Sequence, residues 1–312
     1  MNVLVTGGLG FIGSNYINYA VKKFSTINFY NLDCLNYCSS LENIKVMNLP
    51  NYNFIKGNIC DYNLIVKILK NNNITHIIHF AAQSHVDTSF TDSLRYTEDN
   101  VKGTHTLLEA VKNTNLDIIF LHFSTDEVYG ESKLDENAKT ELSLLSPTNP
   151  YAASKAAAEM YVNSYIHSFN LKGIITRCNN VYGNNQYHEK LIPKFIKLLK
   201  ENKKCTIHGD GKALRTFIHV DDVSRAIEFI LDKGQIGEIY NIGSDINNEM
   251  NVLNLTKLLI FKIKKDYDFE KYIEYVDDRP FNDQRYFITN DKIKNLGWKQ
   301  EIDFEDGINL LI

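Results

Sequence analysis

The sequence is poor in the residues that form disulfide frameworks and hinges. It contains five cysteines and five prolines in 312 residues, and no proline- or glycine-rich linker separates one part of the chain from another. The cysteines are odd in number, are scattered and lack C-x-x-C spacing, which favours reduced packing residues of a cytoplasmic protein over a disulfide framework. They are Cys34, Cys38, Cys60, Cys178 and Cys205.

Long apolar runs and an excess of positive charge are also missing. No segment approaches the roughly 18 consecutive apolar residues of a membrane span. Met1 leads directly into Val3-Leu4-Val5 without a basic leader, so we expect neither a membrane anchor nor a signal peptide. The net charge of −4 argues against general nucleic-acid binding, which normally requires a basic surface.

What the sequence does contain is an alternation of short β-rich runs and helical patterns in its first half. The runs are almost continuously apolar, which is typical of parallel strands covered by helices on both faces. We expect strands at 2–6, 27–32, 52–56, 76–80, 118–123 and 173–176, with helices near 12–22, 61–71, 93–113 and 151–169. The predicted fold class is therefore α/β, with a Rossmann-type doubly wound parallel sheet.

A glycine-rich turn follows the first expected strand and opens the first helix. Gly7, Gly10 and Gly13 give the spacing G-x-x-G-x-x-G, with Phe11 and Ile12 inside it. Glycines permit a tight turn and let backbone N–H groups approach a pyrophosphate at the N-terminus of a helix. Asp33 comes 20 residues after Gly13 (33 − 13) and closes the second strand. A carboxylate there accepts hydrogen bonds from a ribose 2′-hydroxyl and repels a 2′-phosphate, so we predict NAD rather than NADP as the cofactor.

Residues at the ends of the next two strands extend this predicted cofactor site. Asn58 and Ile59 follow the third strand, and Phe80, Ala81 and Ala82 end the fourth. Small side chains at the carboxyl ends of adjacent strands leave room for a flat cofactor, and the carbonyl oxygen of Asn58 is placed to meet the adenine amino group. Helix capping or packing explains the same residues, and the sequence leaves that alternative open.

The alternation of strands and helices becomes irregular after about residue 177. We expect residues 1–177 to form an NAD-binding Rossmann domain, to which 219–241 return. Residues 178–312 are expected to form a smaller, mixed α/β substrate-binding lobe that is interleaved with it.

Two further motifs carry the chemistry. Tyr151 and Lys155 lie four residues apart on an expected helix and therefore on one face, where a cation can stabilise the phenolate of a tyrosine that is otherwise a poor base at pH 7. Thr125 precedes two adjacent carboxyl groups, Asp126 and Glu127, of which one can act as an acid and the other as a base. Together they suggest a reaction that oxidises, eliminates and then reduces again.

These residues together resemble the extended short-chain dehydrogenase/reductase family, and within it the nucleoside-diphosphate-glucose 4,6-dehydratases. The resemblance extends over nearly the whole chain. Its Thr-Asp-Glu triplet is the specific element, because related epimerases usually lack an acid pair at this place. The similar segments are 81–87, 124–130, 149–155, 177–183, 189–193 and 279–286.

The resemblance implies an NAD-dependent hydro-lyase that converts dTDP-glucose or UDP-glucose to the 4-keto-6-deoxy sugar nucleotide. Tyr151, assisted by Lys155 and Thr125, would take the proton of the glucosyl 4-hydroxyl as C4 is oxidised. Glu127 would remove the C5 proton, and a neutral Asp126 would protonate the departing 6-hydroxyl before hydride returns to C6. The product would serve deoxysugar synthesis, of which rhamnose is a common end point.

The resemblance also implies substrate contacts. Arg215 and Arg279 suit the diphosphate, because guanidinium groups bind phosphate in a forked geometry. No additional ligand at metal spacing accompanies His85 and Asp87, so we expect no metal. The helices that start near 93 and 151 are expected to form a homodimer interface. The remaining substrate candidates are Ser84, His85, Asp87, Asn180, Glu189, Lys190, Leu191 and Asn282.

Three questions stay open at this point. Gln83 and Asn58 stand where bacterial dTDP-glucose enzymes commonly have acidic residues. The sequence therefore does not decide whether the substrate nucleotide carries uridine or thymidine. A sugar-nucleotide 4-epimerase or decarboxylase of the same family is one alternative, although it would need no acid pair. A non-catalytic NAD-binding protein is the other, although it would have no reason to keep Thr125, Tyr151 and Lys155 intact.

Overall fold

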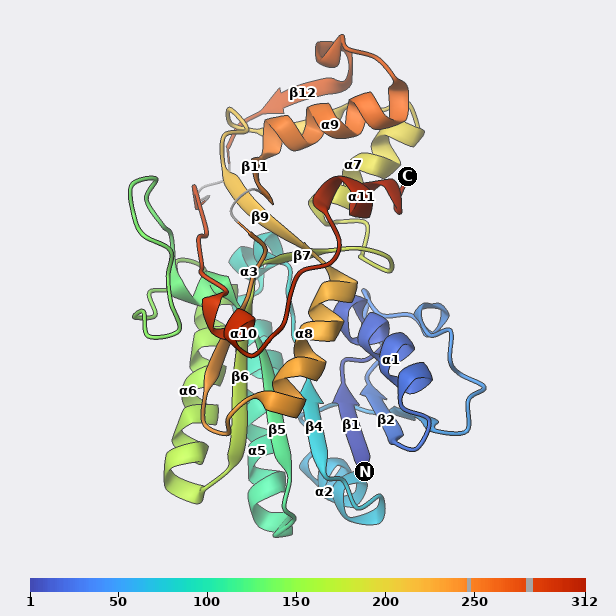
Figure 1. The fold of residues 1–312 in the computed structure, drawn as a ribbon, viewed down its shortest axis with the longest axis vertical. Helices are drawn as coiled ribbons and strands as arrows, with labels where there is room; N and C mark the ends of the chain where they lie inside the picture. The colour runs from blue at the N-terminus through green and yellow to red at the C-terminus, as the bar shows by residue number, and fades with distance from the viewer. Residues whose placement is uncertain (246–247, 279–282) are drawn as a thin grey trace.

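The computed structural model describes residues 1–245, 248–278 and 283–312, and a seven-stranded sheet forms the centre of its larger lobe (Figure 1). The strand order is β10-β6-β5-β4-β1-β2-β3, and every neighbouring pair is parallel. The chain therefore winds outward in both directions from β1, which confirms the predicted doubly wound sheet. The strands are β1 (Asn2–Thr6), β2 (Asn28–Asp33), β3 (Tyr52–Lys56), β4 (His76–His79), β5 (Ile119–Thr125), β6 (Lys172–Cys178) and β10 (Ile239–Ile242).

Helices cover both faces of this sheet. One face packs against α1 (Phe11–Lys23) and α8 (Val220–Lys233), and the other against α2 (Tyr62–Asn71), α5 (Gly103–Thr114) and α6 (Pro150–Phe169). Successive residues of a strand point to opposite faces, so Val3 and Val5 join the apolar cluster under α1 and α8 while Leu4 joins the cluster under α2, α5 and α6. Burial on both sides explains why these strands read as continuous apolar runs.

The helix predicted at 93–113 consists of three consecutive segments. After α3 (Val86–Thr91) the chain forms α4 (Ser93–Tyr96), a π-helical turn (Thr97–Lys102) and then α5. The sequence pattern located this helix correctly but gave no sign of the π turn. Such turns are rare and frequently lie at functional sites, and this one carries the buried Asn100.

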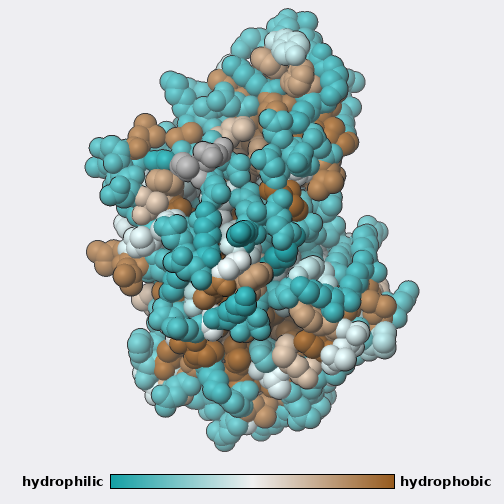
Figure 2. Space-filling model, viewed as in Figure 1, coloured by the Kyte–Doolittle hydropathy of each residue, from teal (hydrophilic) through white to brown (hydrophobic). Residues whose placement is uncertain are grey.

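The smaller lobe lies at the top of Figure 1, and its described residues form short strands, three α-helices and a 3₁₀ turn (Phe269–Tyr272). Its apolar core includes Tyr182, Phe195, Leu259 and Phe304. On the face drawn in Figure 2, hydrophilic side chains cover much of this lobe, whereas brown side chains gather in the lower third of the view, where the large sheet and its helices lie. The elements are β7 (Asn180–Tyr182), β8 (Cys205–His208), β9 (Leu214–His219), β11 (Glu249–Asn251), β12 (Ile273–Val276), α7 (Leu191–Lys200), α9 (Val252–Lys264) and α11 (Phe304–Asn309).

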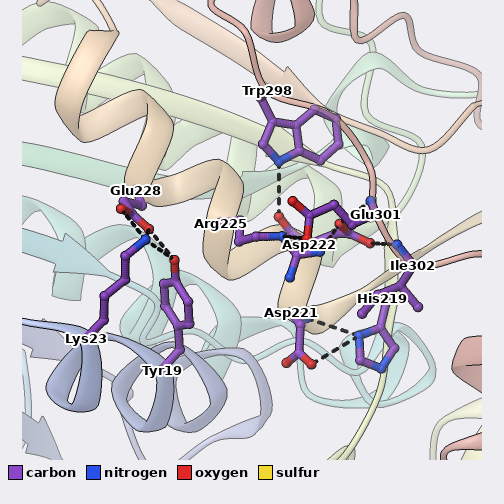
Figure 3. Close-up of polar contacts among 10 residues, drawn as sticks. All are labelled: Tyr19, Lys23, His219, Asp221, Asp222, Arg225, Glu228, Trp298, Glu301 and Ile302. Atoms are coloured by element: carbon purple, nitrogen blue, oxygen red, sulfur yellow. Dashed lines mark hydrogen bonds and ion pairs between the residues drawn. The ribbon is translucent and has the colours of Figure 1, made fainter.

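Between its two stretches in the smaller lobe, the chain returns to the large sheet. Strand β10 pairs with β6, and α8 packs on α1. Lys23 on α1 forms an ion pair of 2.7 Å with Glu228 on α8, and the Tyr19 hydroxyl donates to the same carboxylate (Figure 3). The division of the chain into two domains stays a prediction.

The C-terminal segment is fastened to the N-terminal end of α8 through Asp222 (Figure 3). The Asp222 carboxylate is fully buried and accepts hydrogen bonds from the backbone N–H groups of Glu301 (2.8 Å) and Ile302 (3.1 Å). Its backbone carbonyl accepts from the indole Nε1 of Trp298 at 3.3 Å. After α10 (Asp291–Asn295), the tail therefore crosses the edge of α8 in a fixed register on its way to α11.

All five cysteines are free thiols. In the described part of the chain, no helix combines the length and the apolar character needed to cross a bilayer.

Candidate active site

A cleft of about 570 Å³ opens at the carboxyl ends of the central strands, where the chain order reverses between β1 and β4. This is the position at which doubly wound sheets bind ligands. Most of the site residues predicted from the sequence line it. They are Gly7, Gly10, Phe11, Ile12, Gly13, Asp33, Asn58, Ile59, Phe80, Ala81, Ala82, Ser84, Thr125, Asp126, Glu127, Tyr151, Lys155, Asn180, Glu189 and Lys190.

Four of the predicted substrate residues lie elsewhere. His85, Asp87 and Leu191 line a second groove of about 440 Å³, which shares Glu189 with the cleft. Arg215 lies on β9, with its guanidinium 4.9 Å from the centre of the Tyr286 ring. The last two predicted residues, Arg279 and Asn282, lie outside the described residues.

The glycine turn brings the start of α1 to the floor of the cleft. Gly7 has φ +71°, and a Cβ on it would lie 2.6 Å from the backbone of Ala81 at the end of β4, so a side chain is excluded there. Gly10 is the N-cap of α1 and offers no side chain to its first N–H groups. These donors and the positive end of the helix dipole face the cleft, as an anionic pyrophosphate requires.

Asp33 ends β2 beside this turn and is almost fully buried. Its Oδ2 accepts from the backbone N–H of Leu9 at 3.0 Å and its Oδ1 from that of Leu35 at 2.8 Å, so the carboxylate is fixed at the cleft wall. An NAD ribose hydroxyl suits such a carboxylate, whereas a 2′-phosphate is repelled. The open N-terminus of α1 and the Asp33 carboxylate therefore form a site that suits NAD.

The acid pair follows directly on β5. Thr125 caps the 3₁₀ turn Asp126–Tyr129: its Oγ1 accepts from the backbone N–H of Glu127 at 3.3 Å and donates to Asp126 Oδ1 at 3.2 Å. Asn179 Nδ2 donates to Asp126 Oδ2 at 2.7 Å. Burial, and then the neighbouring Glu127 carboxylate, raise the pKa of Asp126 to about 7, although the bonds from Asn179 and Thr125 oppose the rise. Asp126 can therefore carry a proton near neutral pH.

Glu127 lies between the cleft and a second set of polar groups. Burial raises its pKa, and the Asn149 hydrogen bond and the positive charges of Arg215 and Lys190 oppose this. Asn149 Nδ2 donates to Glu127 Oε2 at 3.1 Å, and Tyr286 Oη lies 3.5 Å from the same oxygen. Glu127 and Asp126 therefore have raised pKa values but different polar partners, which suits two neighbouring carboxyl groups with separate roles as base and acid.

Tyr151 and Lys155 lie on the first turns of α6. Asn149 caps this helix, accepting from the Ala152 N–H at 2.8 Å, and Pro150 starts it. The pKa of Tyr151 is raised, chiefly by burial and then by the charge of Glu127, and a hydrogen bond with Thr125 opposes the rise. Lys155 Nζ donates to the carbonyl of Phe123 at 2.7 Å, and burial lowers its pKa to about 8. We expected the ammonium of Lys155 to lower the pKa of Tyr151, but it is not among the principal influences on that phenol.

Several residues of the site were not predicted from the sequence. Asn100 on the π turn donates to the Gln83 carbonyl at 3.0 Å and to Ser154 Oγ at 2.8 Å, and it accepts from the Gln83 N–H at 2.7 Å. It therefore ties the loop after β4 to α6, beside Lys155. Asn179 and Tyr286 were missed as well. Both lie in segments that resemble the family, but the sequence pattern predicted no function for either residue.

Comparisons with known proteins find curated relatives named as 4,6-dehydratases, and solved structures of 4,6-dehydratases and of nucleotide-sugar 4-epimerases. The sequence model described as GDP-mannose 4,6 dehydratase matches residues 4–311. A dTDP-D-glucose 4,6-dehydratase of Dictyostelium discoideum is 45% identical, over 98% of this chain and 79% of its own length. A trifunctional UDP-glucose 4,6-dehydratase, epimerase and reductase of Arabidopsis thaliana is 46% identical over 98% of this chain, which corresponds to 46% of the plant protein. The crystal structure of the dTDP-glucose 4,6-dehydratase DesIV of Streptomyces venezuelae, solved with NAD bound, superposes with a TM-score of 0.92 at 36% identity, over 99% of this chain and 94% of that one.

Proposed function

Because the chain belongs to the GDP-mannose 4,6-dehydratase family, we propose that it is a nucleoside-diphosphate-glucose 4,6-dehydratase. It converts dTDP-glucose or UDP-glucose to the 4-keto-6-deoxy sugar nucleotide with loss of water. The observation that carries the proposal is the acid pair: Asp126, with a pKa of about 7, and Glu127 share one cleft with Tyr151 and Lys155. A 4-epimerase would need neither carboxyl group.

The residues that would hold NAD are the turn at Gly7, Gly10 and Gly13, the N-terminus of α1, and Asp33. Phe80, Ala81 and Ala82 would bound the nicotinamide side, and Asn58 and Ile59 the adenine side. When bound, NAD takes up a hydride from sugar C4 and gives it back at C6, so that no net oxidation occurs. Solved neighbours of this chain bind NAD, and the uncapped helix and the fixed Asp33 carboxylate support the same cofactor here.

Tyr151 takes the proton of the sugar 4-hydroxyl on its Oη. Its raised pKa means that it needs help to ionise, and its hydrogen bond with Thr125 opposes that rise. The ammonium of Lys155 would move from the Phe123 carbonyl toward the nicotinamide ribose and the Tyr151 oxygen. Thr125 would then hold the C4 oxygen.

The two carboxyl groups carry out the elimination. Glu127 removes the proton at C5, which the C4 ketone has made acidic. Asp126, protonated below pH 7, gives its proton to the 6-hydroxyl, which leaves as water. Asn179 and Thr125 keep the Asp126 carboxyl directed at the leaving group.

The nucleotide would lie across the smaller lobe. Ser84, Asn180, Glu189 and Lys190 line the cleft at this side, and Lys190 Nζ is placed there by its bond to the Ser84 carbonyl at 2.7 Å. Arg215 would supply positive charge to the diphosphate, and the second groove, with His85, Asp87 and Leu191, would take the more distant part of the nucleotide. Roles for Arg279 and Asn282 remain expectations from the sequence. In this arrangement residues 1–177 with 219–241 form the NAD-binding domain, and the rest of 178–312 forms the substrate lobe.

We also propose a cytoplasmic homodimer that supplies deoxysugar synthesis. Five free thiols are typical of a reducing compartment. The plant relative couples the dehydratase step to a 4-keto-rhamnose reductase, which supports rhamnose as an end product. Helix α6 exposes Met160 and Phe169, which are about half accessible, and the short α4 exposes Leu94, so the two predicted helices offer apolar surface to a second copy. Light scattering of the wild type and of Met160→Glu tests the dimer, which should dissociate in the variant.

The function is tested by NMR of the purified protein with UDP-glucose and dTDP-glucose. We expect a C6 methyl signal without net accumulation of NADH, and the ratio of kcat/KM values identifies the preferred nucleotide. A new galactosyl anomeric proton would establish an epimerase instead, and no product from either sugar would refute the proposal.

Two variants separate the steps. Glu127→Gln should oxidise C4 and accumulate NADH without forming product, because no base remains for C5. Tyr151→Phe should not form NADH at all. Glu270→Gln and Tyr267→Phe are the matched controls, because both residues are exposed and neither lines the cleft or the second groove. Wild-type turnover by Glu127→Gln would contradict its assigned role.

A further inference from the structure

A row of hydrogen-bonding groups leads from Glu127 away from the cleft. Tyr286 Oη lies 3.5 Å from Glu127 Oε2 and donates to Asp283 Oδ2. Thr148 Oγ1 is 2.9 Å from each oxygen of the Asp283 carboxylate. Asp283 and Tyr286 are only 4% and 5% exposed, whereas Thr148 is exposed. The row therefore connects the proposed C5 base with the protein surface.

The geometry around Tyr286 gives this row a direction. A phenol has one proton to donate, and Tyr286 gives it to Asp283, so its oxygen presents a lone pair toward Glu127. The separation of 3.5 Å to Glu127 Oε2 is long for a hydrogen bond between oxygens, as expected while Glu127 is a carboxylate. Once Glu127 is protonated, it becomes a donor, and Tyr286 Oη is an acceptor 3.5 Å from its Oε2.

Tyr286 is held so that it passes a proton on without ionising. The guanidinium of Arg215, on β9, lies 4.9 Å from the centre of its ring and packs against it. Burial, and then the carboxylates of Glu127 and Asp283, raise the pKa of the phenol, so it loses its proton only when it gains another. Asn149, the other group on Glu127 Oε2, offers an amide donor and cannot accept a proton.

We propose that Tyr286, Asp283 and Thr148 form a proton relay that exchanges the C5 hydrogen of the substrate with solvent. The proposal rests on the proposed function, in which Glu127 is the C5 base. The three residues are positioning and relay residues, because none of them touches the reacting carbon.

The steps balance as follows. The C5–H bond breaks, its electron pair forms the C5–C6 double bond, and the 6-hydroxyl leaves with the proton of Asp126 as water. The C5 proton goes to Glu127 Oε2, which passes it to Tyr286 Oη while the phenol proton moves to Asp283 Oδ2. Asp283 releases a proton to water through the Thr148 hydroxyl. The same groups, operating in reverse, return a solvent proton to C5 when C6 is reduced.

The relay matters because Glu127 lines the cleft in which the substrate would bind. A nucleotide sugar there would cover the cleft side of this carboxyl group. The proton held by Glu127 would then return to the same C5 unless another route leads out, and the row through Asp283 supplies that route.

The test is to run the reaction in D₂O and to read the C6 methyl signal of the product. Deuterium at C5 removes the coupling that splits this signal, so exchange turns the methyl doublet into a singlet. We expect a singlet from the wild type and a restored doublet from Tyr286→Phe and Asp283→Asn, whose products keep the substrate's own C5 hydrogen. A merely structural role for either residue would lower the rate and leave the deuterium content unchanged.

Controls separate the possible failures. Tyr182→Phe removes the hydroxyl of another buried tyrosine, which donates to the Phe304 carbonyl, and should give a singlet. Thr148→Val changes only the exposed end of the row, so it tests the relay even if the two buried variants do not turn over. The relay predicts a doublet from Thr148→Val, and a singlet would overturn it. A singlet from Tyr286→Phe and Asp283→Asn, or a doublet from the wild type, would also overturn it. Absence of any methyl signal from the wild type would instead refute the proposed dehydratase.

Discussion

Asn179 should set the pH above which the elimination fails. Its Nδ2 donates to Asp126 Oδ2 at 2.7 Å, and this bond lowers a pKa that burial and Glu127 together raise to about 7. In Asn179→Leu the side chain keeps a similar size but offers no donor. The ionised form of Asp126 then loses its partner, and the pKa of Asp126 rises further.

The magnitude follows from the strength of one hydrogen bond. A bond to a charged group contributes about 1.5–3 kcal/mol, and about 1.4 kcal/mol corresponds to one pH unit. The pKa of Asp126 should therefore rise by about 1–2 pH units. Since Asp126 must be protonated to act, the alkaline limb of kcat, expected near pH 7 in the wild type, should move to about pH 8–9.

The assay is the pH dependence of kcat between pH 5 and about pH 10, followed by formation of the 4-keto product. Asp126→Asn should lack this limb and lose about 10²–10⁴ in kcat. Ser244→Ala is the matched control, because the Ser244 backbone N–H, not its side chain, contacts Asn179. An alkaline limb at the same pH in Asn179→Leu and in the wild type would refute the assignment of Asp126 as the acid.

Three further predictions concern stability. The pKa of Asp126 rises from 3.8 to about 7 on folding, so the folded state binds this proton more tightly than the unfolded state. Ionisation of Asp126 therefore destabilises the fold by about 4 kcal/mol above pH 7. In urea titrations Asp126→Asn should be more stable than the wild type by up to that amount at pH 8, with no difference below about pH 4. Glu159→Gln should cost about 3–5 kcal/mol, because it leaves the buried Arg177 guanidinium, now bonded to Glu159 at 2.7 Å, without a counter-charge, and an unchanged urea midpoint would contradict this. Asp222→Ala should expose the segment before Glu301 to limited proteolysis and cost about 1–3 kcal/mol, since two partly buried N–H groups lose their buried acceptor. Equal cleavage rates in wild type and variant would count against the anchor.

The central sheet could be predicted from the sequence because its signals are local. Each parallel strand is buried on both faces and reads as an apolar run, and the turn from Gly7 to Gly13 marks the first helix. The end of β5 was placed two residues too early, at 123 instead of Thr125. The predicted strand ended at 123 because Ser124 and Thr125 are polar. The strand in fact includes both residues, so that Thr125 lies at the cleft.

The polar network around the acid pair could not be predicted in the same way. Asn179 reaches Asp126 from 53 residues away, and Tyr286 reaches Glu127 from 159 residues away. No periodicity relates such positions, and only the meeting of β5, β6 and the segment after Asp283 brings them together. The π turn that carries Asn100 was missed as well, because the sequence pattern contains no separate signal for it.

The late return of β10 to the sheet has a consequence for synthesis on the ribosome. Strand β6 ends at Cys178, and its partner β10 begins only at Ile239, 61 residues later (239 − 178). At about 5–20 residues per second, the outer edge of β6 stays unpaired for about 3–12 s while the smaller lobe is being made. An open strand edge pairs readily with other chains. Nascent molecules of this protein should therefore be most vulnerable to aggregation during that interval, and holdase chaperones should bind stalled chains that end between residues 180 and 240 more strongly than longer ones.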